Sequence, residues 1–314
     1  MGDPKWFTED IYLTRIVPVA VIIPTFNRGA AVHSILKRIQ HCDPKPAEIW
    51  VHVDLADGIL ECDLRRSFAD VKVLASPIRL GPGGGRHRCL LACGTPYAVS
   101  FDDDSYPVDS DFFSTVELLF SEHADAAIFA AKIWHRNEPA IARSQTLISC
   151  PSYIGCGYAI RLAAYRQVRG YIPRSVPYGM EECDLSLQLF VAGWHMYEAG
   201  SLRVFHDTDL KHHCAPEITS GVIENVGLYA FLHYPVIGWG LALAQVANKV
   251  AYCIRMGRLR GIWSGICRIP VECYRNRCYR KPIGWRTLRR FRRLRRNRVD
   301  PTLALEPAWK ASDV

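Results

Sequence analysis

Short apolar runs alternate with helical segments over about the first two hundred residues, and this alternation constrains the fold more than any other feature. The runs are Val19–Ile23, Glu48–Val53, Val71–Leu74, Tyr97–Phe101 and Ala126–Ala131. Helical patterns separate them at 29–40, 83–92 and 111–120. Buried strands of about five residues separated by helices predict a doubly wound, mostly parallel α/β sheet. Ligands bind beyond the carboxyl ends of such strands, so chemistry is expected at residues 24–28, 54–58 and 102–105.

The pattern changes after Pro216. The sequence therefore predicts an N-terminal extension (residues 1–16), an α/β domain (17–215) and a helical, basic C-terminal region (216–314). The formal charge of +8 is unevenly distributed: residues 255–298 carry 16 Lys and Arg and one acid, whereas the rest of the chain has a net charge of −7. This asymmetry indicates a local anionic partner, either lipid headgroups or nucleic acid.

Residues 225–248 form a stretch of 24 residues without a formal charge. A transmembrane helix needs about 20 apolar residues, but this stretch contains His233, Pro235, Gln245 and Asn248. The composition favours helices that pack on the domain or lie in a membrane interface, and it leaves a membrane span open.

The segment that follows alternates apolar and basic residues. Trp285, Leu288, Phe291 and Leu294 are interleaved with seven arginines. This pattern is typical of an interfacial helix on the anionic cytoplasmic leaflet of a membrane. Binding to nucleic acid and a solvated basic arm are the alternatives, and the membrane is favoured.

Twelve cysteines are present, but no CxxC pair occurs and several lie in apolar or helical stretches. The N-terminal residues lack the basic and apolar regions of a secretory signal. A reducing, cytoplasmic compartment is therefore expected, with the protein peripheral at the cytoplasmic face of a membrane.

Three consecutive aspartates, Asp102, Asp103 and Asp104, close the fourth predicted strand. Carboxylates so close together raise one another's pKa unless a cation lies among them. Mg²⁺ and Mn²⁺ prefer such oxygen ligands and share them with substrate phosphates. The alternative is a helix cap or a solvated acidic turn.

Four segments in order resemble the inverting family 2 glycosyltransferases of the GT-A fold. They are the first strand with its extension to Arg28, the glycine-rich segment Gly81–Arg86, the aspartate cluster, and Gly179–Leu189, which contains Glu181, Glu182 and Asp184. The resemblance covers roughly residues 17–210. It implies a GT-A catalytic domain that uses a nucleotide-diphosphate sugar and Mn²⁺ or Mg²⁺ to extend a glycan or a lipid-linked glycan, as in polysaccharide biosynthesis.

The resemblance also implies roles for individual residues. The metal ligands would be Asp104, Asp102 and His206, which follows a late strand, and the catalytic base would be Glu182. Glu181, Asp184, Gly155 and Gly157 would lie at the acceptor site. The donor would contact Pro24, Thr25, Arg28, Asp54, Gly81, Arg86, Asp102 and Asp103.

The chemistry of these groups supports the implied roles. A divalent cation stabilises the charge that develops on a departing diphosphate, and a single carboxylate base implies one displacement and hence inversion. For Glu181, Glu182 and Asp184 the alternative is an ordinary set of acids in a helix first turn. Two other functions stay open: a non-catalytic nucleotide-sugar-binding module tethered by its basic tail, and a nucleotidyltransferase.

Overall fold

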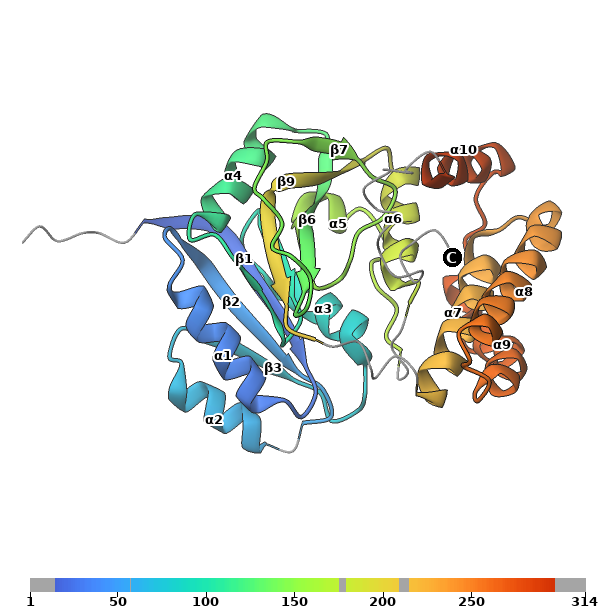
Figure 1. Cartoon of the computed structure of the whole chain (residues 1–314), viewed down its shortest axis with the longest axis horizontal. Coiled ribbons are helices and arrows are strands. Elements are labelled where there is room, and N and C mark those ends of the chain that lie inside the picture. The colour runs from blue at the N-terminus through green and yellow to red at the C-terminus, as the bar shows by residue number, and fades with distance from the viewer. Residues whose placement is uncertain (1–14, 57, 175–178, 209–214, 297–314) are drawn as a thin grey trace, which may run out of the picture.

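The apolar runs form the centre of one mixed sheet (Figure 1). The computed structural model describes residues 15–56, 58–174, 179–208 and 215–296, so most of the expected N-terminal extension lies outside them. Over the described residues the strand order is β3-β2-β1-β4-β8-β6-β9-β5, with β7 paired to β9. The strands are β1 (Ile16–Thr25), β2 (Lys45–Val53), β3 (Val71–Ala75), β4 (Tyr97–Phe101), β5 (Ser105–Pro107), β6 (Ala126–His135), β7 (Leu147–Ser149), β8 (Gly157–Arg161) and β9 (His195–His206).

Six of the nine described strands run in the same direction, as expected from the predicted mostly parallel sheet. β1 pairs in parallel with β2 and β4, β2 with β3, and β6 with β9. β8 lies between β4 and β6 and is antiparallel to both, so those two strands point the same way. The carboxyl ends of β1, β4 and β9 therefore meet at one edge of the sheet. The sequence pattern did not predict the antiparallel strands β5, β7 and β8.

Helices cover both faces of the sheet, because the central strands are apolar on both sides. In β1, Val19, Val21 and Ile23 face one core while Ala20 and Ile22 face the other. The first core is closed by α1 (Gly29–Gln40), α2 (Ile59–Ser67) and α4 (Phe112–Glu122). The second is closed by α3 (Gly81–Ala92), α5 (Leu162–Tyr165) and α6 (Glu181–Val191).

The described residues after 215 are mainly helical. They form α7 (Pro216–His233), the 3₁₀ turn η2 (Val236–Gly238), α8 (Trp239–Arg255), α9 (Ile262–Arg275), the 3₁₀ turn η3 (Arg277–Tyr279) and α10 (Trp285–Arg296). The uncharged stretch 225–248 is divided between α7 and α8 at Tyr234 and Pro235. Among the described residues no helix has both the length and the apolar character needed to cross a bilayer.

The prediction that α10 offers its apolar stripe to a membrane is wrong. Leu288 and Phe291 are 0% and 1% exposed, and they pack with residues of α6 and α7. The ring of Phe291 lies 5.2 Å from that of Phe190 at the end of α6. Leu288 and Phe291, at the centre of the stripe, are buried because α10 folds back onto α6 and α7, whereas Leu294 near the end of the helix is 42% exposed. The amphipathic pattern alone does not distinguish such a contact from a contact with lipid.

Candidate functional site

Three side chains from distant parts of the chain meet at the edge where β1, β4 and β9 end. Asp102 follows β4, His206 ends β9, and Cys156 precedes β8. Cys156 reaches this edge because β8 starts there, with Gly157 paired to Phe101 at the end of β4. The Ser105 hydroxyl ties the turn together: it accepts the Asp102 amide at 2.8 Å and donates to the Cys156 carbonyl at 2.7 Å.

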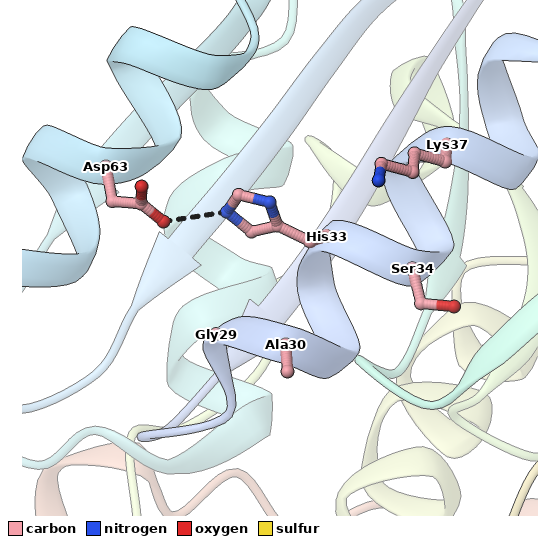
Figure 2. Close-up of a pocket in the computed structure, with 6 residues that line it drawn as sticks. All are labelled: Gly29, Ala30, His33, Ser34, Lys37 and Asp63. Carbon is pink, nitrogen blue, oxygen red and sulfur yellow. Dashed lines mark hydrogen bonds and ion pairs between the residues drawn. The ribbon is translucent and has the colours of Figure 1, made fainter.

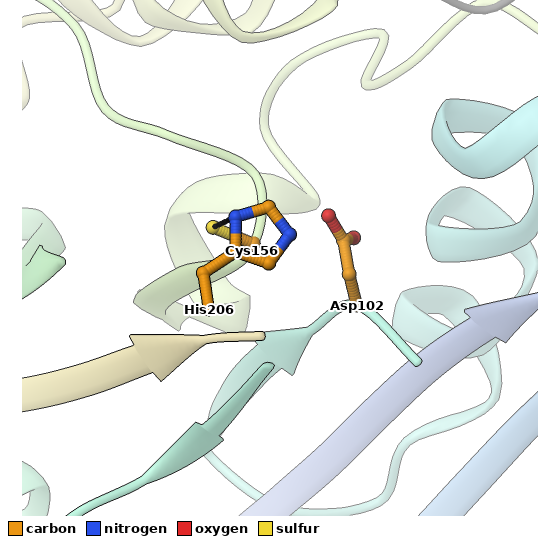
Figure 3. A group of neighbouring side chains, drawn as sticks. All are labelled: Asp102, Cys156 and His206. Carbon is orange, nitrogen blue, oxygen red and sulfur yellow. Dashed lines mark hydrogen bonds between the residues drawn. The ribbon is translucent and has the colours of Figure 1, made fainter. Parts of the chain in front are cut away.

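These three side chains could hold a metal ion (Figure 3). One oxygen of Asp102, the Cys156 sulfur and one ring nitrogen of His206 all lie within 4.8 Å of one another. The His206 Nδ1 also lies 3.6 Å from the Cys156 sulfur. A carboxylate, an imidazole and a thiol form a donor set that suits a borderline ion better than Mg²⁺, which prefers oxygen ligands.

Asp104, the other predicted metal ligand, lies beside this group and is bonded to it. Its Oδ1 is 3.0 Å from His206 Nε2, and its Oδ2 accepts Arg28 Nη1 at 2.9 Å. Burial disfavours the ionised carboxyl, but these two partners outweigh it and lower the pKa of Asp104. Burial likewise opposes protonation of His206, yet Cys156 and Asp104 raise its pKa. A metal ion bound at His206 would have to replace that proton.

Asp103 shares Arg28 with Asp104 and also contacts the end of β1. Its carboxylate is buried, accepts the Thr25 hydroxyl at 2.8 Å and accepts Arg28 Nη1 at 2.6 Å. Burial raises the pKa of Asp103 to about 7, against the lowering effect of Arg28 and Thr25. The predicted donor residues Thr25, Arg28 and Asp103 are thus in mutual contact, and the half-exposed Arg28 guanidinium is left at the surface of the site.

Arg86 connects the aspartate turn to the predicted base. It is buried in α3, its Nε donates to the Ser100 hydroxyl at 3.0 Å, and its Nη2 donates to Asp102 Oδ1. A Cβ atom placed on Gly155 would lie 2.9 Å from Arg86 Nη2 and 2.6 Å from Glu182 Oε1. The structure therefore brings Asp102, Arg86, Gly155 and Glu182 together in one site.

Glu181 and Glu182 open α6 and face this site. Burial is the main cause that raises the pKa of Glu182 to about 8; the adjacent Glu181 adds to it and Arg86 opposes it. Burial also raises the pKa of Glu181. A carboxyl group that gains and loses a proton near neutral pH is suited to general base catalysis.

The glycine-rich segment is part of helix α3 and is not a loop. Gly84 and Gly85 are buried, and a Cβ on Gly85 would lie 2.6 Å from Nδ1 of His52 in β2. The glycines therefore allow α3 to approach the sheet closely. Asp54 holds the start of this helix, because its carboxylate accepts the amides of Leu80 at 2.7 Å and Gly81 at 2.9 Å.

Two predicted acceptor residues are engaged elsewhere. The buried Asp184 carboxylate pairs with His233 of α7 and with Arg169. It therefore joins α6 to the helical region instead of facing the aspartate turn. A Cβ on Gly157 would meet the side chains of Val204 and Ile133 at 3.2 and 3.3 Å, so this glycine serves sheet packing.

Pro24, the remaining predicted donor residue, lies at the end of β1 against α3. A separate hollow of about 510 Å³ opens between α1 and α2 (Figure 2). It is lined by Gly29, Ala30, His33, Ser34, Lys37 and Asp63, and none of the candidate site residues lines it.

Sequence reasoning missed Cys156 as a candidate ligand. Its local signal is weak, since one cysteine between two glycines in an apolar run resembles a core residue. Only the antiparallel insertion of β8 next to β4 places its sulfur beside Asp102 and His206.

Residues 20–175, about half of the 314 residues, match the family described as Glycosyl transferase family 2. No curated protein sequence matches the chain. Solved structures share the fold at low identity. GalNAc-T7 with UDP, GalNAc and Mn²⁺ is 13% identical at a TM-score of 0.59, over 74% of this chain and 51% of that one. The chain thus spans about half the length of GalNAc-T7.

Two further structures are similar over more of their own length. The mannosyltransferase PcManGT from Pyrobaculum calidifontis, with GDP-Man and Mn²⁺, is 13% identical at a TM-score of 0.52, over 82% of this chain and 70% of that one. TarS 1–349 from S. aureus with UDP-GlcNAc is 15% identical at a TM-score of 0.53, over 74% and 72%. The expected GT-A fold is confirmed by these neighbours. With the match over residues 20–175, the chain belongs to glycosyl transferase family 2.

Proposed function

We propose that this family 2 glycosyltransferase transfers a sugar, with inversion, from a nucleotide-diphosphate donor to a hydroxyl of a glycan or lipid-linked glycan. The observation that carries the proposal is the contact chain Asp102–Arg86–Gly155–Glu182, which unites the aspartate turn and the first turn of α6 in one site. UDP, UDP-GlcNAc and GDP-Man in similar structures support a nucleotide donor.

The site residues have three separate roles in the proposed reaction. Glu182, when ionised, accepts the proton of the acceptor hydroxyl as that oxygen attacks. Arg86 and Arg28 place fixed positive charge beside the acidic turn, where the donor's diphosphate would bind. Asp102, Cys156 and His206, with Asp104 beside them, would hold a divalent ion, and Mn²⁺ suits this donor set better than Mg²⁺. Such an ion supplies charge neutralisation for the leaving diphosphate.

The proposal is tested by incubating the protein with UDP- and GDP-sugars and a panel of acceptors, with Mn²⁺ and with EDTA. We expect release of nucleoside diphosphate that needs the metal and falls by about a hundredfold or more in Glu182→Gln, while donor binding persists. Donor binding without turnover under any acceptor would favour the non-catalytic module. Release of pyrophosphate would favour a nucleotidyltransferase.

We propose further that the enzyme works as a peripheral protein at the cytoplasmic face of a membrane. The support is the concentration of positive charge in residues 255–298. Because α10 buries Leu288 and Phe291 against α6 and α7, the centre of its apolar stripe does not face lipid.

A further inference from the structure

Helix α8 exposes an apolar outer side, and on its inner side it buries polar residues among apolar ones such as Val246 and Cys253. Gln245 and Lys249 are buried on its inner side, where the Gln245 carbonyl oxygen accepts the Tyr234 hydroxyl at 2.7 Å and the Lys249 ammonium lies 5.0 Å from the centre of the Tyr252 ring. The outward side chains are mainly apolar: Trp239, Leu243, Ala244, Ala247, Ala251 and Ile254. On an ordinary surface helix the outward side chains are mainly polar.

Helix α9 also exposes apolar side chains, although Ile262, Ile266 and Ile269 already give it an apolar inner side. Trp263, Pro270, Val271 and Tyr274 are exposed, and Trp263 is 76% exposed. The one acid of this helix, Glu272, is buried on the inner side.

The inner side of α9 rests on an ionic network. Arg275 donates to Glu272 at 2.9 Å. Beneath it, the buried Glu224 of α7 accepts Arg268 at 2.7 Å and also accepts Arg174. The acids Glu224 and Glu272 are thus paired within the protein, whereas the Arg268 and Arg275 side chains stay partly exposed.

The two outer faces belong to one part of the molecule. α8 and α9 both pack against α7 and share a cluster around Ile223 and Cys253. Figure 1 shows the pair on the side of α7 that faces away from the sheet. Met256 and Leu259, in the turn that joins the helices, are also exposed. We call the outward side chains of 239–274 the α8–α9 face.

Basic residues border the α8–α9 face. Arg255, Arg260, Arg275 and Arg277 are exposed around it. Between Trp239 and Arg296, all within the described residues, the one acid is the buried Glu272. Apolar and aromatic side chains bordered by arginine match the boundary between the acyl chains and anionic headgroups of a bilayer.

We propose that the α8–α9 face is the membrane-binding surface of this protein, lying in the interface of an anionic bilayer with Leu243 and Trp263 inserted among the lipids. The inference deepens the proposed membrane location and rests on it, but it does not depend on sugar transfer. Nucleic acid would leave the apolar side chains without a partner. A second copy of the chain would bring two arginine-rich borders together.

The test is flotation of the full chain with phosphatidylcholine vesicles and with vesicles containing phosphatidylglycerol. We expect binding to the anionic vesicles, reduced about tenfold or more in the double variant Leu243→Ser/Trp263→Ser. The matched control is Ile59→Ser/Leu118→Ser, which removes two exposed apolar side chains from α2 and α4. The control should bind vesicles like the unmodified chain.

Three results would overturn the proposal: a folded protein, by circular dichroism, that does not bind anionic vesicles; equal binding by both double variants; or a dimer in analytical ultracentrifugation that Leu243→Ser/Trp263→Ser dissociates. Donor hydrolysis in detergent-free solution, measured on the same samples, separates these outcomes from a failure of the proposed glycosyl transfer.

Discussion

Arg86 donates a hydrogen bond to Asp102 from within the core of the α/β domain, and the same guanidinium lies beside Gly155. Because Gly155 also adjoins Glu182, one buried cation connects the acidic turn after β4 to the first turn of α6. An uncompensated guanidinium would be costly at this depth, so the carboxylates and Arg86 hold one another in place. The site is therefore fixed by electrostatics as well as by packing.

Gly155→Ala should impair turnover more than stability. The new methyl group would lie 2.6 Å from Glu182 Oε1 and must displace it. We expect kcat to fall about tenfold or more, because small misplacements of a catalytic group are costly. The assay is nucleoside diphosphate release, with thermal unfolding measured in parallel. Gly240→Ala is the control, since no atom lies within 4 Å of its added methyl group; equal kcat values for the two variants would contradict the assigned contact.

The activity should rise with pH up to about pH 8. Glu182 must be ionised to accept a proton, and its pKa is raised to about 8, mainly by burial. Below that pH the protonated fraction grows, so kcat/KM should fall by about tenfold for each pH unit. Glu182→Gln should lose this ascending limb. A profile that is flat between pH 6 and pH 8 would exclude Glu182 as the titrating base.

Cys156→Ser should change the metal preference. A thiol favours softer ions than a hydroxyl does, so the concentration of Mn²⁺ needed for half-maximal activity should rise about tenfold, with a smaller change for Mg²⁺. Metal titration of EDTA-treated protein measures both values. Cys93→Ser, at another buried cysteine, controls for loss of a thiol in the core. If Cys156→Ser and Cys93→Ser change the half-maximal concentrations of Mn²⁺ and Mg²⁺ to the same extent, Cys156 is not a metal ligand.

Asp184→Asn should destabilise the protein. Asp184 is buried against His233 and the partly buried Arg169, and removal of its charge leaves both groups without their counter-ion. The expected loss in free energy of unfolding is about 3 kcal/mol by urea denaturation. Asp111→Asn breaks an ion pair with Arg143 in which both side chains are partly exposed, and it should cost less than about 1 kcal/mol. An equally small loss in the free energy of unfolding for Asp184→Asn would show that the Asp184–His233 pair does not join α6 to α7.

Local patterns were sufficient for much of the α/β domain. The buried strands and α1 follow from apolar runs and helical periodicity, and the predicted helix 29–40 has the observed limits of α1. The acidic turn was also predictable from the sequence, because its aspartates come directly after an apolar strand. These features depend on neighbours in the sequence, so the sequence alone can indicate them.

Other features depend on contacts between distant residues. The position of β8 between β4 and β6 decides that Cys156, and not only aspartates, lies beside His206. The Arg pattern of residues 285–296 predicts an amphipathic helix but not its partner, which is α6.

The sequence by itself thus determined the α/β class, the succession of buried strands along the chain and the residue types at the strand ends, because these are set by local hydrophobic patterning. Only the tertiary structure decided which of those residues meet, which polar residues of α8 and α9 are buried and which apolar faces stay exposed. A hydrophobic pattern shows that a face will be buried, but its partner is selected by the packing of the whole chain.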